Sequence, residues 1–226
     1  MDYLNTWAIV PVKPFKQAKS RLSSALSPDQ REALAQHLFR QCLHLLLGVK
    51  KFSGVLVVSR DSKALAIAHD YHAHTIQESG EPELNPALTR AAQILLTRNV
   101  QSIFVMPADL PFVTLDDIEQ ILHLGRFLHS AVLVPDSIED GTNSLMLTPP
   151  NLIPFAFGAG SFNRHKALIE QTGASLQIYR SERMGLDLDM PADLERYQAM
   201  TTTREMPIVE LDIEALQRSD PDNVSP

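Results

Sequence analysis

The sequence predicts a single α/β domain, a three-layer sandwich with helices on both faces of a mostly parallel sheet. Three observations support this. Short segments rich in Val, Ile and Leu alternate with segments of helical periodicity. The 226 residues, of which 44% are hydrophobic and 21% charged, suit one sizeable core. The alternation ends near Met200, so we expect a domain over residues 1–200 and an appended tail over 201–226.

The first elements are the most clearly marked. A short apolar run predicts a strand over residues 6–12, and a basic loop follows it. The first helix has a full start signal, because Ser27 can cap it, Pro28 fits its first turn and Gln30 lies three residues after the cap. Gly48 is a suitable residue to end this helix.

Strands and helices continue to alternate beyond Gly48. The expected strands are 54–59, 74–78, 102–111 (running into a loop), 130–136, 143–149 and 175–180, and the expected helices are 61–71, 86–98, 115–124, 160–173 and 190–200. No helix is evident between the segments 130–136 and 143–149. We therefore expect an antiparallel addition to the parallel sheet at this point.

Composition excludes several classes of function. A net charge of −7 argues against broad nucleic-acid binding, which usually needs a basic face. No run of about 18 apolar residues is present and the N-terminus lacks the pattern of a signal peptide, so the chain is expected to be cytoplasmic. The single cysteine, Cys42, lies in an apolar helical pattern and is expected in the core. The tail is acidic, with a candidate short helix at 208–217.

Positive charge is concentrated directly after the first strand. Lys13, Lys16, Lys19 and Arg21 lie within nine residues, and no acidic residue occurs from Tyr3 to Pro28. Such a loop could bind polyphosphate, or it could be a solvated basic loop. The phosphate-binding pattern GxxxxGK[ST] is absent, which argues against a P-loop ATPase.

Carboxylates follow two other predicted segments. Asp109 comes after an apolar strand and could hold a divalent cation, although a simple turn residue would look the same. Asp187 and Asp189 precede the last helix and could face one cation, or one of them could cap that helix. The histidines 69, 72 and 74 cross a helix-to-strand boundary, so a metal site there is disfavoured.

Two further loops carry small and polar residues. Residues 140–143 form either a plain turn or a donor group that includes the Thr142 hydroxyl. In the second loop, Gly158 precedes Ser161, which could cap a helix whose N-terminus binds an anion, or could simply end a flexible link. His165 is interpreted as a surface residue in the first turn of that helix.

Six segments in this order resemble a known family. They are VPVKPFKQAKSRL, ELNPAL, ADLP, DGTNSLMLTPP, FGAGSFNRH and LDLDMPADL, within residues 6–199. Together they resemble the guanylyltransferases of coenzyme F420 biosynthesis, which act on phosphoenolpyruvate or 2-phospho-L-lactate. The resemblance implies a nucleotidyltransferase-like fold related to the molybdopterin-guanine transferases, whose Gly-rich first loop is here replaced by lysines.

The resemblance also implies roles for individual residues. Lys13, Lys19 and Arg21 would hold the phosphates of GTP and serve catalysis, and Asn85 would lie near the ribose or base. Asp109 and Asp189 would hold Mg²⁺. The residues that match the family's positions for the phosphorylated three-carbon acid are Thr142, Gly158 and Ser161.

Several alternatives stay open at this point. The acceptor could be phosphoenolpyruvate, 2-phospho-L-lactate or 3-phosphoglycerate, and the chain could form a homodimer. The protein could instead be another nucleotidyltransferase, acting on a sugar phosphate or molybdopterin, or a non-catalytic nucleotide-binding domain. A metal-dependent glycosyltransferase is a third alternative, because that fold is related.

Overall fold

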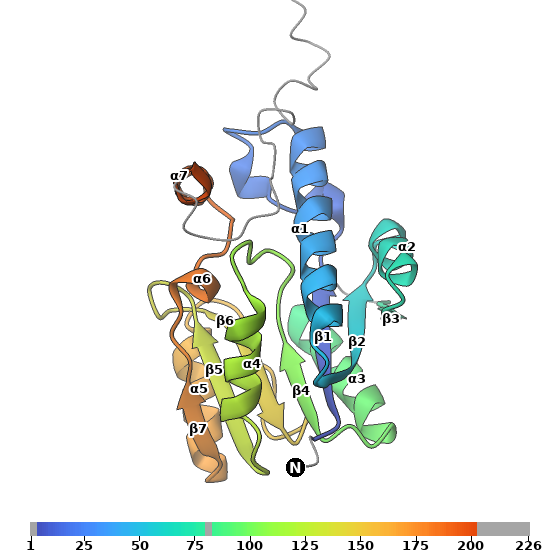
Figure 1. Ribbon diagram of the computed structural model, residues 1–226, viewed down its shortest axis with the longest axis vertical. Helices are drawn as coiled ribbons and strands as arrows, with labels where there is room; N and C mark the ends of the chain where they lie inside the picture. The colour runs from blue at the N-terminus through green and yellow to red at the C-terminus, as the bar shows by residue number, and fades with distance from the viewer. Residues whose placement is uncertain (1–3, 80–82, 203–226) are drawn as a thin grey trace, which may run out of the picture.

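The computed structural model describes residues 4–79 and 83–202, and it contains one seven-stranded sheet (Figure 1). The strands are β1 Thr6–Val12, β2 Phe52–Ser59, β3 His74–Gln77, β4 Ser102–Val105, β5 Ser130–Pro135, β6 Thr142–Thr148 and β7 Ser175–Ile178. The helices are α1 Pro28–Gly48, α2 Ser62–Asp70, α3 Leu84–Thr97, α4 Leu115–Leu124, α5 Ser161–Thr172, α6 Glu182–Gly185 and α7 Pro191–Thr202.

The sheet is parallel except for one strand. The strand order is β3-β2-β1-β4-β6-β5-β7, and β6 runs antiparallel to both of its neighbours, β4 and β5. The expected α/β class is confirmed, and so is the antiparallel addition, which inserts β6 between two parallel groups. Because β6 runs in the opposite direction, its first residue lies at the edge of the sheet where the parallel strands end.

Alternating side chains of the strands build two apolar layers. Along β1, Ala8 and Val10 face a cluster that includes α1, α2 and α4, whereas Trp7 and Ile9 face a cluster that includes α3 and α5. Figure 1 shows α1 and α4 in front of the sheet and α3 and α5 behind it. Cys42 lies in the first cluster, and burial raises the pKa of its thiol, so the expectation of a core cysteine is confirmed.

A third apolar cluster joins segments that are distant in the sequence. Leu22 and Leu26 of the basic loop pack in the same cluster as Leu186 and Leu188 near the C-terminal helix. The other members come from α1, the loop after β4, and α7: Leu34, Leu38, Phe112, Leu194 and Tyr197. This cluster brings the basic loop close to the segment that carries Asp187 and Asp189.

Most predicted elements are present, with small shifts at their ends. The start of α1 is confirmed in detail, because Ser27 and Gln30 form a reciprocal capping box. The strand expected over 102–111 ends at Val105, and α6 was not predicted. The candidate helix at 208–217 lies outside the described residues. Within the described residues, no helix is long and apolar enough to cross a membrane.

Candidate active site

The predicted functional residues gather at the edge of the sheet where the parallel strands end, which is the upper end in Figure 1. Lys13 directly follows β1, and Asp109 lies four residues after β4. Thr142 is the first residue of β6, which pairs with β4 through Val105 and Leu145. Three neighbouring strands therefore deliver a cation, a carboxylate and a hydroxyl to the same edge.

The basic loop is folded into two short 3-10 turns, Phe15–Gln17 and Ser20–Leu22. Between them, Lys19 adopts the left-handed conformation, with φ 55°, and its side chain turns into the protein. Only 4% of that side chain is exposed, whereas Lys13 and Lys16 are exposed. The interpretation of a solvated loop is therefore wrong for Lys19, although it describes Lys16.

Lys19 bridges the two carboxylates that the sequence singled out. Its Nζ lies 2.8 Å from Asp109 Oδ2 and 3.0 Å from Asp189 Oδ1. Burial alone would lower the pKa of Lys19, but the two carboxylates outweigh it and the pKa is raised. Arg21 Nη1 lies 3.6 Å from the other oxygen of Asp189, and its own side chain is largely exposed.

Asp187 and Asp189 are not equivalent. The carboxylate of Asp189 accepts a hydrogen bond from Lys19. The backbone turns back at this point, because the Asp189 N–H donates to the Asp187 carbonyl. Burial and the nearby charges of Asp109 and Asp189 raise the pKa of Asp187 to about 6. The negative charges of Asp109 and Asp189 thus act on Asp187, whereas the Lys19 ammonium group forms ion pairs with Asp109 and Asp189.

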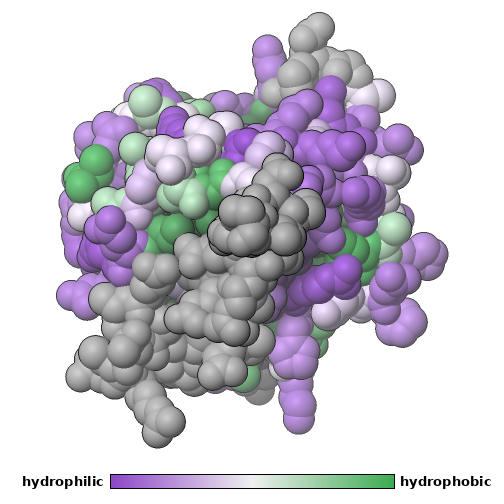
Figure 2. All heavy atoms as spheres, turned by 90° about the horizontal axis from the view of Figure 1, so that it is seen from above, coloured by the Kyte–Doolittle hydropathy of each residue, from purple (hydrophilic) through white to green (hydrophobic). Residues whose placement is uncertain are grey.

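A cavity of about 610 Å³ opens beside these groups, a volume in the range of small-molecule sites, about 300–1,000 Å³. Lys13, Lys19, Arg21, Asp109 and Asp189 all contribute to its lining. Figure 2 looks down on this end of the molecule, where the described surface is mainly hydrophilic with a few hydrophobic side chains showing between. The cavity therefore combines the basic loop and the carboxylates in one concave surface.

The lining of this cavity also includes residues that were not predicted from the sequence. Arg60 follows β2 and Glu78 follows β3, and they form an ion pair with 3.6 Å between Nη2 and Oε2. Glu83 and Leu84, at the start of α3, also line this cavity. Because β2 and β3 end at the same edge as β1, the rule that ligands bind at that edge could have identified Arg60 and Glu78.

Thr142, Gly158 and Ser161 converge in a second group. The Thr142 backbone N–H donates to Ser161 Oγ over 2.9 Å, and the Ser161 N–H donates to the Gly158 carbonyl over 3.0 Å. The proposed capping role of Ser161 is wrong, because Gly160 is the N-cap and Ser161 is the first residue of α5. The serine hydroxyl instead binds the start of β6.

Gly158 has a conformational reason to be glycine. Its φ of 124° is open to glycine and strained for residues with a Cβ. A Cβ built there would meet only Arg164, at an ordinary contact distance of 3.7 Å. The backbone conformation, rather than crowding by the protein, therefore restricts this position.

His165 is buried, so its interpretation as a surface residue is wrong. Its Nδ1 lies 3.0 Å from Thr142 Oγ1, and its Nε2 accepts a hydrogen bond of 3.0 Å from the Ala156 N–H. Burial, together with the nearby Arg164, lowers the pKa of His165 to about 4. The sequence signal that could have found it is its spacing of four residues from Ser161, which places both on one side of α5.

Asn85 holds the loop of Gly158 rather than lining the cavity described above. Its Nδ2 donates to the Phe157 carbonyl over 3.2 Å, and its Oδ1 accepts from the Phe157 N–H over 2.8 Å. Both ends of the amide are therefore used by one backbone unit. The contact with ribose or base that the resemblance implied remains a prediction, and it would use the second N–H of Nδ2 or the second lone pair of Oδ1.

The carboxylates fit a shared divalent cation. Asp109 and Asp189 both lie within 3.0 Å of one ammonium nitrogen, so the two carboxylates can bind one positive centre. Their oxygens are hard ligands of the kind Mg²⁺ prefers. Among residues 4–79 and 83–202, no group of three or more His, Cys, Asp or Glu side chains could hold a metal.

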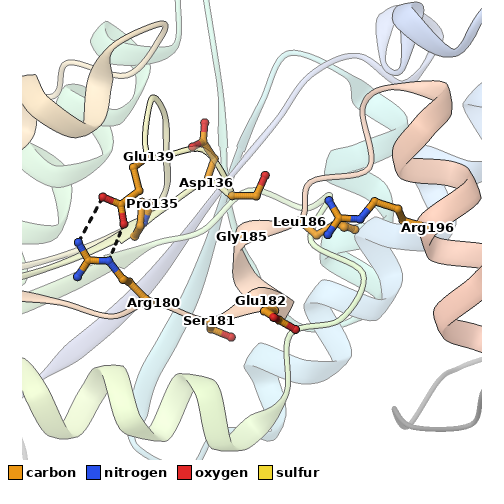
Figure 3. Close-up of a pocket in the computed structure, with 10 residues that line it drawn as sticks. Pro135, Asp136, Glu139, Arg180, Ser181, Glu182, Gly185, Leu186 and Arg196 are labelled. Carbon is orange, nitrogen blue, oxygen red and sulfur yellow. Dashed lines mark hydrogen bonds and ion pairs between the residues drawn. The ribbon is translucent and has the colours of Figure 1, made fainter.

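A second cavity, of about 630 Å³, lies beside α6 (Figure 3). Arg180 there forms an ion pair with Glu139, and Arg196 of α7 lies on the other side of the cavity. Three carboxylates line it against these two guanidinium groups: Asp136, Glu139 and Glu182. The cavity beside the basic loop has more cations, Lys13, Lys19, Arg21 and Arg60, balanced by four carboxylates, and it is therefore the better candidate for a triphosphate.

Comparison with known proteins gives the family. The family described as "Guanylyl transferase CofC like" matches residues 6–201. The chain belongs to this family. The family resemblance deduced from the six sequence segments is thereby confirmed.

Individual CofC-like relatives span nearly the whole chain. A phosphoenolpyruvate guanylyltransferase from Rubrobacter xylanophilus is 35% identical over 196 residues, which is 87% of this chain and 95% of the relative. A 3-phospho-D-glycerate guanylyltransferase from Colwellia psychrerythraea is 32% identical, with coverage of 85% and 90%. A 2-phospho-L-lactate guanylyltransferase from Methanothermobacter thermautotrophicus is 31% identical, with coverage of 84% and 83%.

Solved structures support the fold of this CofC-like chain. A protein from Desulfovibrio desulfuricans G20, described as a nucleotide-diphospho-sugar transferase, has a TM-score of 0.72 at 14% identity, covering 95% of this chain and 94% of that one. A nucleotidyl transferase from Methanothermobacter thermautotroptrophicus has a TM-score of 0.64 at 10% identity, covering 88% and 98%. The nucleotidyltransferase-like fold is confirmed.

Proposed function

We propose that this protein is a guanylyltransferase of coenzyme F420 biosynthesis that joins GMP from GTP to the phosphate of phosphoenolpyruvate or 2-phospho-L-lactate and releases pyrophosphate. The observation that carries the proposal is the ion cluster in which Lys19 bridges Asp109 and Asp189 beside a cavity lined by the basic loop. Membership of the CofC-like family and the names of its relatives support the same reaction.

The nucleotide is assigned to the cavity with the basic loop. Lys13, Lys19 and Arg21 bind the triphosphate there, because all three line the cavity. Asp109 and Asp189 would hold Mg²⁺, which when bound would neutralise phosphate charge between them. On arrival of the triphosphate, Lys19 would exchange its carboxylate partners for phosphate oxygens.

The chemistry requires charge neutralisation more than proton transfer. An oxygen of the acceptor phosphate attacks the α-phosphorus of GTP, a new P–O bond forms, and the bond to the β-phosphate oxygen breaks with its electrons leaving on pyrophosphate. A phosphate monoester has a second pKa of about 6, so the nucleophile is ionised at neutral pH and needs no general base. Two unit anions 4 Å apart repel by about 4 kcal/mol at an effective dielectric of 20. The cationic loop offsets this repulsion.

The acceptor is assigned to the group formed by Thr142, Gly158 and Ser161. Thr142 and Ser161 are the first residues of β6 and of α5, and the group offers hydroxyl donors rather than cations, because the Thr142 and Ser161 N–H groups already donate within the protein. A phosphorylated acid can bind such a site without competition from pyrophosphate, which prefers the basic loop. Phosphoenolpyruvate and 2-phospho-L-lactate differ only in the saturation of one carbon–carbon bond, so both are tested as acceptors.

A product assay tests the function. The purified protein is incubated with GTP, Mg²⁺ and one acceptor at a time, and the product mass is measured. We expect a diphosphate-linked guanosine adduct and pyrophosphate with phosphoenolpyruvate or 2-phospho-L-lactate. A third arm uses 3-phosphoglycerate, because one relative carries that name. Formation of no adduct with any of the three acids would reject the proposed function.

A further inference from the structure

His165 occupies an unusual position between the two parts of the acceptor group. Its ring is fully buried and contacts Phe157 edge-on, with 4.9 Å between ring centroids. One ring nitrogen faces Thr142 at the start of β6, and the other faces Ala156 in the loop that carries Gly158. The imidazole therefore links these two segments, in addition to the contacts that Ser161 and Asp140 make between them.

The contacts of His165 determine which ring nitrogen carries the proton. The Ala156 backbone N–H can only donate, so Nε2 must offer its lone pair. In a neutral imidazole the proton is then on Nδ1, which donates to Thr142 Oγ1 over 3.0 Å. The pKa of about 4, lowered by burial and Arg164, keeps the ring neutral at physiological pH.

This tautomer controls the direction of the Thr142 hydroxyl. Because Oγ1 accepts from Nδ1, the hydroxyl hydrogen cannot be donated to His165 and is directed to another partner. The Thr142 backbone N–H already donates to Ser161 Oγ, so the Ser161 hydroxyl hydrogen is also directed away from Thr142. The hydroxyl hydrogens of Thr142, 8% exposed, and of Ser161, 1% exposed, are thus not used in these two contacts, and the Thr142 hydroxyl can donate to a ligand.

We propose that His165 is a positioning residue that makes Thr142 a hydrogen-bond donor for an anionic acceptor. A carboxylate or phosphate offers only acceptor oxygens, so a site whose hydroxyls donate favours it over a neutral alcohol or amide. The proposal rests on the proposed function, because that function places the acceptor at Thr142. It adds a residue that contacts no substrate and acts through Thr142 and the Ala156 loop.

Two substitutions separate the two ring contacts. His165→Asn keeps a donor near the position of Nδ1 and loses the partner of Ala156. His165→Gln keeps an acceptor near the position of Nε2 and loses the donor to Thr142. His129→Asn is the matched control, because His129 is exposed and its ring contacts the Thr172 carbonyl at the opposite end of α5.

The expected result is a split in the kinetic constants. His165→Gln should raise the acceptor KM about tenfold to a hundredfold, the loss typical of a hydrogen bond to a charged group, and leave the GTP KM within about twofold. His165→Asn should raise the acceptor KM much less, and His129→Asn should not change it. In the Thr142→Val background, His165→Gln should have little further effect. Equal changes in the KM of GTP and acceptor, or equal effects of the two His165 variants, would overturn the proposal.

A measurement on the wild-type protein does not depend on turnover or on the folding of a variant. Long-range ¹H–¹⁵N correlation spectra of the imidazole distinguish the two tautomers. We expect a protonated Nδ1 and an unprotonated Nε2 on His165 from pH 6 to 8. A protonated Nε2 would reject the proposal even if guanylyl transfer were observed, whereas failure of the product assay alone would reject the proposed function.

Discussion

At the scale of single residues, Lys19 is the most deeply buried of the cations that line the cavity. Its ammonium group is removed from water and held between Asp109 and Asp189 at 2.8 and 3.0 Å. Breaking a buried ion pair on one side leaves uncompensated charge, here two carboxylates that repel each other. Lys19 therefore stabilises the free site and, because it occupies the position between the carboxylates, it would compete with a divalent cation bound there.

Replacement of Lys19 should strengthen metal binding in the absence of nucleotide. Lys19→Gln removes the competing charge, so we expect Mg²⁺ or Mn²⁺ to bind at least about tenfold more tightly in a calorimetric titration without GTP. Lys16→Gln is the matched control, because Lys16 belongs to the same loop but is exposed. Equal metal affinities of the two variants would show that Lys19 does not compete with a metal ion.

The carboxylates should contribute unequally to metal binding. Asp109→Asn and Asp189→Asn each replace a carboxylate that contacts Lys19 with a poorer ligand for a hard cation, so both should abolish metal-dependent turnover. Asp187→Asn should have a smaller effect, because Asp187 contributes only its negative charge near Asp109 and Asp189. Turnover at several Mg²⁺ concentrations is the measurement, and a larger loss in Asp187→Asn than in Asp189→Asn would reverse the assignment.

At the scale of elements, the loop before α5 is held from three sides. Asn85 of α3 binds the Phe157 backbone, His165 of α5 accepts from Ala156, and Asp140 accepts from the Gly160 N–H over 2.9 Å. Within this loop, Gly158 adopts its positive φ. The loop is thus fixed before a ligand arrives, which limits the entropy lost on binding.

Substitution of Gly158 should damage acceptor binding more than stability. Gly158→Ala forces a Cβ onto a strained backbone at a cost of about 1–3 kcal/mol, and relief of that strain would shift the loop. We expect a raised acceptor KM and an unchanged dissociation constant for GTP. Gly173→Ala is the matched control, because Gly173 also has positive φ, 70°, with open space around it at the other end of α5. An effect on acceptor KM as large in Gly173→Ala would contradict this role.

A buried carboxylate joins α4 to the segment that ends at Asp189. Asp117 is fully buried and accepts from Arg183 Nε over 2.8 Å and Nη2 over 2.9 Å, as well as from the Tyr179 hydroxyl over 2.9 Å. Burial would raise the pKa of Asp117, but the hydrogen bonds from Arg183 and Thr114 outweigh it and lower the pKa to about 2. The network fixes α6 and, through it, the start of the segment that carries Asp187 and Asp189.

The Asp117 network should make part of the stability acid-sensitive. Its folded pKa lies below the usual value of about 3.8, so its stabilising contribution is complete above pH 4 and is lost as pH falls toward 2. Asp117→Asn should lower the free energy of unfolding by about 2–3 kcal/mol in urea at pH 7 and flatten the pH dependence between 4 and 2. Asp116→Asn, on the exposed side of the same turn, should leave both close to wild type. A wild-type pH profile in Asp117→Asn would contradict the assignment.

At the scale of the whole molecule, the general architecture followed from local patterns. Alternating apolar strands and periodic helices predicted the α/β class, and the missing helix between residues 136 and 143 predicted the antiparallel pair. The strand order could not be predicted in this way. Insertion of β6 between β4 and β5 depends on long-range pairing that no local segment reveals.

The sequence singled out candidate residues that the fold brings together, but it did not show their surroundings. It marked Lys19, Asp109 and Ser161, but it did not show that Lys19 is buried or that Ser161 binds the Thr142 backbone. These contacts join residues 19 to 170 positions apart, so no spacing rule can detect them. His165 was misjudged because a polar residue in a first helical turn is usually exposed, whereas here the loop at Ala156 folds over it.

The central claim is that an oxygen of the acceptor phosphate attacks the α-phosphorus of GTP. It is tested most directly with phosphoenolpyruvate, or 2-phospho-L-lactate, carrying ¹⁸O in the non-bridging positions of its phosphate, followed by ³¹P NMR and mass analysis of both products. We predict ¹⁸O in the bridge of the new diphosphate and none in the released pyrophosphate. Labelled pyrophosphate, or a diphosphate bridge without ¹⁸O, would contradict the account.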